Sequence, residues 1–150
     1  MRGARWISAL ALATTLLAFV WAGSARAGRP GGGYQLIVNP RNPNSAADRK
    51  FVEDAFLKKI TRWSGGETIQ PVDLAPDSPT RRAFSGSVLK RSVEAVKSYW
   101  QARIFSGRDV PPPELDSDDG VVAYVLKHDG AVGYISAGAE LRGAKLLAVR

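Results

Sequence analysis

The sequence predicts an α/β domain, in which short strands alternate with amphipathic helices along the chain. Two observations support this fold class. Short β-prone runs stand at 34–38, 69–74, 131–135 and 145–149. Between them, apolar residues recur at helical spacing after serines that suit helix N-caps. This alternation is typical of layered domains whose sheet carries helices.

The first half of the chain is expected to form a strand, a helix and a second strand. The first strand covers 34–38. Ser45 is predicted to cap the helix, with Asp48 three residues later as its capping-box partner. The second strand covers 69–74, where Pro71 indicates an edge position or a strand start, because proline has no N–H to donate.

The second half is expected to form three helices followed by two strands. Ser78 and Ser92 are predicted to cap the first two helices. The acidic residues that follow Ser117 favour a third helix start, because negative charge stabilises the first turn of a helix. Strands at 131–135 and 145–149 complete the order. The second helix has one predicted core face, formed by Val93, Val96, Trp100 and Ile104.

A signal peptide is predicted over residues 1–27. A basic start precedes a long uncharged apolar run, and Ala25-Arg26-Ala27 fits the small-x-small cleavage pattern. A membrane anchor is disfavoured, because the run is shorter than the roughly 20 residues that span a bilayer. The mature chain is therefore expected in the periplasm, with a flexible lead-in over 28–33 and one domain over 34–150.

The composition excludes several kinds of function. The chain has 21 basic and 14 acidic residues, and without the three arginines of the signal peptide 18 basic residues remain, a net charge of +4. This modest excess is compatible with an acidic ligand. It is spread along the chain rather than gathered in a basic stripe, so no nucleic acid is expected as a partner. The sequence contains no cysteine, which excludes disulfides and thiol chemistry.

No catalytic residue, metal site or cofactor is predicted. His128, the only histidine, stands at the end of a predicted helix, where capping or solvent exposure explains it. Asp116, Asp118 and Asp119 lack the rest of a calcium-loop pattern and fit a helix start. Nucleophile-elbow, phosphate-loop and zinc-protease motifs do not occur, so the chain is expected not to be an enzyme.

The segment Ser78-Pro79-Thr80-Arg81 is the strongest candidate for a binding site. Ser78 at the N-cap and Pro79 at the first helical position predict a helix start, with unpaired N–H groups and a partial positive charge. The backbone of Thr80 and Arg81, the two hydroxyls and the guanidinium then suit an oxyanion. Ser45, at the other predicted helix start, is a secondary candidate for the same site. On the motif alone, a capped surface helix with basic residues is the simpler reading.

Five segments, taken in order, resemble the substrate-binding proteins of phosphate ABC transporters. The first strand runs into Asn-Pro-Arg-Asn-Pro, similar to the VVNPxNP opening of small exported domains of this kind. Later segments resemble the patterns SpxRxxF, yWxxxiFtG and GAIGY. The resemblance covers nearly the whole mature chain. The matching segments are 34–43, 55–63, 78–84, 99–107 and 130–134.

The resemblance implies one lobe of a type II periplasmic binding fold, with a mixed sheet flanked by helices. It further implies that inorganic phosphate or a similar oxyanion binds at Ser78, Thr80 and Arg81, and that a membrane transporter or sensor is the protein partner. Pro79 departs from the pattern, because transporter-linked binders have glycine there, and the chain is long enough for about one of two lobes. These departures leave an alternative, an envelope interaction module that keeps the fold without the ligand. The oligomeric state is not predicted.

Overall fold

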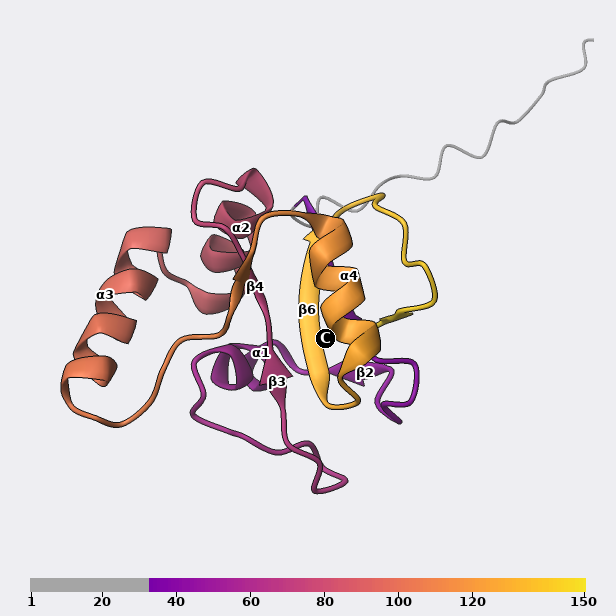
Figure 1. Ribbon diagram of the computed structural model, residues 1–150, viewed down its shortest axis with the longest axis horizontal. Coiled ribbons are helices and arrows are strands. Elements are labelled where there is room, and N and C mark those ends of the chain that lie inside the picture. Colours follow the sequence, from indigo (N-terminus) through magenta and orange to yellow (C-terminus); the bar gives the residue numbers. More distant parts are fainter. Residues whose placement is uncertain (1–32) are drawn as a thin grey trace, which may run out of the picture.

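A four-stranded mixed sheet lies at the centre of the molecule (Figure 1). The structure is a computed structural model that describes residues 33–150. The strand order is β3-β6-β1-β7, in which β3 runs parallel to β6, and β1 runs antiparallel to both β6 and β7. The strands are β1 (Tyr34–Val38), β3 (Gln70–Pro71), β6 (Ala131–Ser136) and β7 (Lys145–Leu146).

Two further pairs of short strands and four α-helices complete the described part of the chain. The parallel pairs are β2 (Ala46–Ala47) with β8 (Ala148–Val149), and β4 (Asp73–Leu74) with β5 (Glu114–Leu115). The helices are α1 (Arg49–Phe56), α2 (Pro79–Phe84), α3 (Val93–Phe105) and α4 (Asp118–Lys127), and α2 continues into a π-helical segment, η1 (Ser85–Leu89). The predicted signal peptide, and the predicted lead-in apart from Gly33, lie outside the described residues.

Helices cover both faces of the sheet, as two neighbouring residues of β6 show. A Cβ added at Gly133 would lie only 2.7 Å from a side-chain atom of Val121 in α4. Tyr134 stacks instead on Phe84 of α2, with 3.9 Å between the ring centroids. Successive residues of a strand point to opposite faces. Thus α4 packs on one face of the sheet, and α2 packs on the other.

Four aromatic rings fill the core on the α2 side of the sheet. Phe84 lies 4.7 Å from Phe56 of α1 and 5.5 Å from Tyr34 of β1, measured between ring centroids. Phe84 and Tyr134 are both fully buried. Tilted, edge-on and stacked ring pairs each contribute about 0.5–1.5 kcal/mol beyond the burial of their area. This packing holds the Tyr134 ring in one position, which directs its hydroxyl toward β4.

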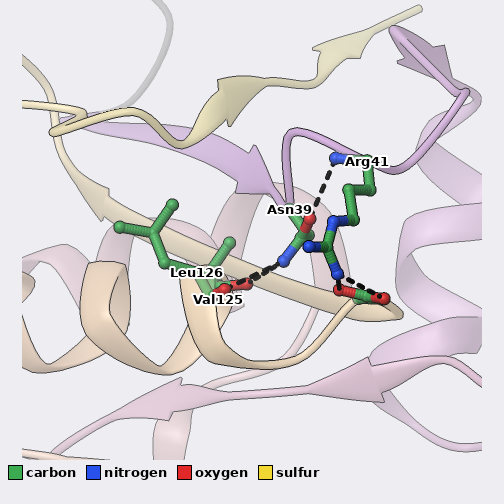
Figure 2. A network of polar contacts seen from close by, with 5 residues as sticks. Asn39, Arg41, Val125 and Leu126 are labelled. Atoms are coloured by element: carbon green, nitrogen blue, oxygen red, sulfur yellow. Dashed lines mark hydrogen bonds and ion pairs between the residues drawn. The ribbon is translucent and has the colours of Figure 1, made fainter.

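The loop after β1 is tied to the carboxyl end of α4 through Asn39 (Figure 2). The Asn39 amide donates to the carbonyls of Val125 at 2.9 Å and Leu126 at 3.2 Å, and its Oδ1 accepts from the Arg41 N–H at 2.9 Å. The Arg41 guanidinium pairs with Asp129 at 3.1 Å. The last carbonyls of a helix lack partners within the helix. Asn39 therefore satisfies them and holds α4 against the sheet.

Helix α3 stands at one side of the molecule, away from the central sheet (Figure 1). It packs on η1, and its side chains Val93, Val96 and Trp100 are buried as predicted. Ile104, predicted on the same core face, has 50% of its surface exposed. That prediction was wrong, because the last turn of α3 extends beyond the elements on which the first turns pack.

Three predicted helix starts are confirmed, and each is capped by a serine. In each case the serine hydroxyl accepts a hydrogen bond from the backbone N–H three residues later, which satisfies one of the unpaired donors of the first turn. Pro71 is confirmed in an edge strand of the central sheet. The capping pairs are Ser78 with Arg81, Ser92 with Ala95, and Ser117 with Gly120.

The helix start predicted at Ser45 was wrong. Helix α1 begins at Arg49, with Asp48 at the N-cap and without a side-chain cap. Ser45 precedes β2, and its carbonyl accepts a hydrogen bond from the Ala148 N–H at 2.9 Å. The capping-box spacing was outweighed by pairing with a strand about 100 residues away, which a local sequence pattern does not reveal.

The predicted strand over 69–74 divides between two sheets. The Val72 N–H donates to Val132 of the central sheet, whereas the Asp73 N–H donates to Pro113, at 2.9 Å in both cases. The partner strand β5 was not predicted. This change of partner matters because the register of β4 and β5 places Asp73 directly beside Glu114.

Replacing Gly130 with alanine is expected to destabilise the fold. A Cβ at Gly130 would lie 1.9 Å from the backbone oxygen of Thr68, so the junction of β3 and β6 must shift. We expect a loss of about 2 kcal/mol or more in the free energy of unfolding, measured by urea denaturation. Gly65→Ala is the control, because a Cβ there meets nothing within 4 Å. Equal stability of the two variants would contradict the packing described here.

Candidate functional site

The predicted site residues at the start of α2 lie where three segments meet, at the carboxyl end of β6. Thr80 of α2 and Ser136 of β6 share a hydrogen bond of 2.8 Å between their hydroxyls. The Ser136 N–H donates to the Asp118 carboxylate, in the first turn of α4, at 3.0 Å. The amino ends of two helices therefore converge on one strand end, which is the usual place for an anion site in an α/β domain.

The helix start at Ser78 has the predicted geometry. Ser78 has extended backbone angles, Pro79 follows at the first helical position, and the Ser78 Oγ accepts from the Arg81 N–H at 3.3 Å. The Arg81 N–H, expected to hold an oxyanion, therefore already has a partner. The Thr80 N–H has no acceptor among residues 33–150, and neither does the proton of the Ser78 hydroxyl.

Arg81 is buried in an ion pair. Its Nη1 lies 2.7 Å from the Asp73 carboxylate, donates to the Leu74 carbonyl at 2.6 Å, and lies 3.4 Å from the Glu114 carboxylate. Only 3% of its surface is exposed. Two alternatives were expected for Arg81, an open anion clamp or a solvated residue, and the structure corrects both. An unpaired guanidinium is expensive to bury, and the adjoining carboxylate of β4 compensates that cost.

The Asp73 carboxylate joins the sheet to α2. It accepts a hydrogen bond from the Tyr134 hydroxyl and pairs with Arg81. Burial raises the pKa of the Asp73 carboxyl to about 6, while the Arg81 guanidinium and the Tyr134 hydroxyl oppose that rise. Burial, reinforced by the negative charge of Asp73, raises the pKa of Tyr134, so this hydroxyl keeps its proton and donates it.

Ser45 does not join the other site residues. Its neighbours Asn44 and Ala46 line a hollow together with Trp63. The Trp63 indole donates to the Gly130 carbonyl at 3.0 Å, immediately before β6 begins, whereas Thr80 contacts the far end of that strand. The assignment of Ser45 to the same site is therefore corrected.

A groove of about 750 Å³ opens beside Arg81, between the start of α2, one side of α3 and the segment that leads into β5. Its walls are mixed. The apolar lining comes mainly from Trp100, Ile104, Pro111 and Pro112, and the charged lining includes Asp77, Glu94, Lys97 and Glu114. The groove lies next to the predicted site at the start of α2 but is lined by different side chains, apart from Arg81.

Sequence reasoning missed four residues that organise the site. Asp73, Tyr134, Glu114 and Ser136 bring the three segments together, yet none was predicted as a site residue. One signal was present, because Asp73 is a carboxylate within an apolar run predicted as a strand. A buried carboxylate requires a partner, and a buried cation is the usual one. A buried cationic partner for Asp73 was therefore open to inference, whereas its identity as Arg81 and the contacts of Glu114 and Ser136 required the tertiary structure.

The other titratable residues of interest have structural partners. His128 Nδ1 lies 2.9 Å from the Tyr124 carbonyl at the end of α4, as expected for a helix-capping histidine. Residues 33–150 contain no cluster of three or more acidic or histidine side chains suited to a metal ion. In the same range, every helix is too short or too polar to cross a bilayer.

Solved structures of phosphate-transport receptors share this fold. The chain matches an ABC-type phosphate transport receptor from Vibrio cholerae with a TM-score of 0.60 and 21% identity, over 79% of this chain and 46% of the other. A phosphate ABC transporter substrate-binding protein from Clostridium perfringens, solved with bound phosphate, matches with a TM-score of 0.62 and 22% identity. The match covers 79% of this chain and 45% of the other. PstS from Borrelia burgdorferi matches with a TM-score of 0.61 and 11% identity, over 79% of this chain and 47% of the other.

The chain therefore has the fold of one lobe of a periplasmic binding protein, and it spans less than half the length of each of these structures. The predicted α/β class, with a mixed sheet flanked by helices, is confirmed. No protein-family model matches the sequence, and no curated protein matches it significantly.

Ionisation of Asp73 is expected to lower stability as the pH rises. Its pKa in the folded state, about 6, lies above its ordinary value of 3.8, so the folded protein holds this proton more tightly than the unfolded chain. The stabilisation is complete below about pH 4 and is lost as the pH rises through 6, at no more than about 1.4 kcal/mol per pH unit. Asp73→Asn removes this titration.

Denaturation of the wild type and of Asp73→Asn at several pH values tests this expectation. The stability of the wild type relative to the variant is expected to fall between about pH 4 and pH 6. A difference that stays constant, or that grows with pH, would show that Asp73 remains ionised throughout.

Proposed function

We propose that this protein is an exported, non-catalytic binding domain that holds phosphate or a related oxyanion at the amino end of α2. The observation that carries the proposal is the convergence of the Thr80 N–H and the Ser78 hydroxyl at the end of β6, in a fold shared with phosphate-transport receptors. Both groups can donate to an anion without breaking a hydrogen bond that the chain itself makes.

The positive potential at this site comes from the backbone. Helix α2 continues into η1, so aligned peptide groups run from Pro79 to Leu89 and leave a partial positive charge at the amino end. The charge of Arg81 is neutralised by Asp73. The site therefore offers only a few donors and no free cation. Binding should be weak, and we expect a dissociation constant in the millimolar range.

A membrane transporter or sensor is the partner that suits such a domain. The solved structures that share the fold are described as transport receptors and substrate-binding proteins, and this chain corresponds to about one lobe of them. A low-affinity domain of this kind responds only to high ligand concentrations. It would therefore serve to report or pass on abundant oxyanion rather than to scavenge traces.

A second candidate function is favoured by the burial of Arg81. Its guanidinium is held by Asp73 and the Leu74 carbonyl, and Pro79 removes the N–H at the first helical position. These features suit an envelope interaction or signalling module that keeps the fold and binds a protein in place of the ligand. In this case the Thr80 N–H and the Ser78 hydroxyl bind no anion.

Isothermal titration with phosphate and with sulfate tests the first candidate. The wild type is expected to give saturable heat in the millimolar range. Ser78→Gly removes one donor hydroxyl, while glycine still suits an N-cap and lowers stability by only a few tenths of a kcal/mol. We expect about tenfold weaker binding, because a hydrogen bond to a charged group contributes at least about 1.5 kcal/mol.

Ser92→Gly is the matched control, because Ser92 caps α3 in the same way and lies outside the site. It is expected to bind like the wild type. A folded wild-type protein that gives no heat with either anion contradicts the first candidate. A membrane protein that is then captured equally by the wild type and by Ser78→Gly supports the second.

Export is tested by the N-terminus of the protein made from the full sequence in a bacterial host. Mass spectrometry is expected to find a chain that begins at Gly28 in the periplasmic fraction, because Ala25-Arg26-Ala27 suits cleavage. Ala27→Lys is expected to block this processing, and Ala27→Ser, which keeps a small residue, to preserve it. A membrane-bound product that retains residue 1 would contradict export by cleavage.

A further inference from the structure

The carboxyl end of α3 carries an exposed apolar surface that nothing in residues 33–150 covers. We call residues 104–110 the α3 tip. Within it, Phe105 has 91% of its surface exposed, Val110 61% and Ile104 50%. These three are the most exposed of the large apolar residues in the described part of the chain. A cluster of this kind marks an interaction surface more often than a chance exposure.

The groove beside Arg81 lies along the same helix. One side of α3 lines it through Val93, Trp100 and Ile104, and the proline-rich segment before β5 forms the opposite wall. The groove has a volume of about 750 Å³ and is partly apolar, which suits an aromatic side chain and its neighbours. The protruding surface and the groove that can receive it therefore belong to one face of the molecule.

The charges of the two surfaces are complementary. The groove carries the carboxylates of Asp77, Glu94 and Glu114, with Lys97 as its one cation besides the internally paired Arg81. On the α3 tip, Asp109 is already paired with Lys58 at 3.3 Å. No ion pair within residues 33–150 involves Arg108, which is exposed. The tip therefore offers an apolar side chain beside a free positive charge, and the groove offers apolar walls beside an excess of negative charge.

We infer that two copies of this chain associate through this face, each placing its α3 tip in the groove of the other. A single helix that carries both a protrusion and a matching groove is self-complementary, and a two-fold axis satisfies both contacts at once. The placement of the charges agrees with this. Glu94 stands in the first turn of α3, and Arg108 follows the end of the helix, after the left-handed turn at Gly107. Antiparallel packing of two α3 helices therefore brings each Arg108 toward the partner's Glu94.

In this arrangement Phe105 enters the partner's groove beside the stem of its Lys97, and it is the residue whose burial contributes most to association. The Glu94–Arg108 pairs select the antiparallel orientation rather than supplying most of the affinity. The inference does not depend on oxyanion binding, because it uses none of the donors at the amino end of α2.

Sedimentation equilibrium of the protein expressed from the full sequence tests the inference. The wild type is expected to be a dimer with a dissociation constant of about 10 µM. Phe105→Asp is expected to weaken association at least 100-fold. Its thermal unfolding midpoint is expected to equal that of the wild type at about 0.1 µM, where both proteins are monomeric, because this side chain is 91% exposed in the single copy. The control is Leu146→Asp in β7, which places a charge at another exposed apolar residue and is expected to leave the dimer intact.

A charge exchange tests the orientation. Glu94→Arg and Arg108→Glu are each expected to weaken association about tenfold, and the double variant is expected to recover most of the loss, because it restores each pair with the signs reversed. A wild type that stays monomeric at about 1 mM overturns the inference. So does a dimer that Phe105→Asp leaves unchanged, or a double variant no tighter than the single ones.

Discussion

The structure depends on the buried contact between Asp73, Arg81 and Tyr134. Asp73 lies in β4, Arg81 in α2 and Tyr134 in β6, so one carboxylate joins the central sheet to the helix that carries the candidate site. Removing one member of such a group leaves a buried charge without a partner, which is more damaging than the loss of a surface ion pair. Stacking of Tyr134 on Phe84 fixes the same junction from the apolar side. The position of the α2 amino end is therefore set by the core.

Because of this buried contact, some polar groups at the candidate site are engaged within the fold and others are left without a partner. The guanidinium of Arg81 and the hydroxyl of Thr80 are engaged within the chain, and they hold α2 against the strand ends. The groups left for a ligand are a backbone N–H and a hydroxyl, which lie in the positive field of the helix amino end. Two such donors without a free cation favour only weak binding of an oxyanion.

Local patterns in the sequence predicted the fold class, the helix starts at Ser78, Ser92 and Ser117, and the edge position of Pro71. Each of these depends on neighbours in the chain, such as a hydroxyl near an unpaired N–H or a missing donor in a strand. The local patterns failed where contacts between segments far apart in the sequence determine the structure. Ser45 pairs through its backbone with Ala148, and Asp73 leaves the central sheet to lie beside Glu114. For the same reason the burial of Arg81 was missed, because its partner on β4 is brought close only by the tertiary fold.

The central claim is that the Thr80 N–H is free to bind an oxyanion. Backbone amide NMR during a titration with inorganic phosphate measures this group directly. We expect the Thr80 amide resonance to move furthest, with smaller shifts at Ser78 and Arg81 and none along β7. A Thr80 resonance that phosphate leaves in place, while the protein stays folded, would show that this N–H does not bind the anion.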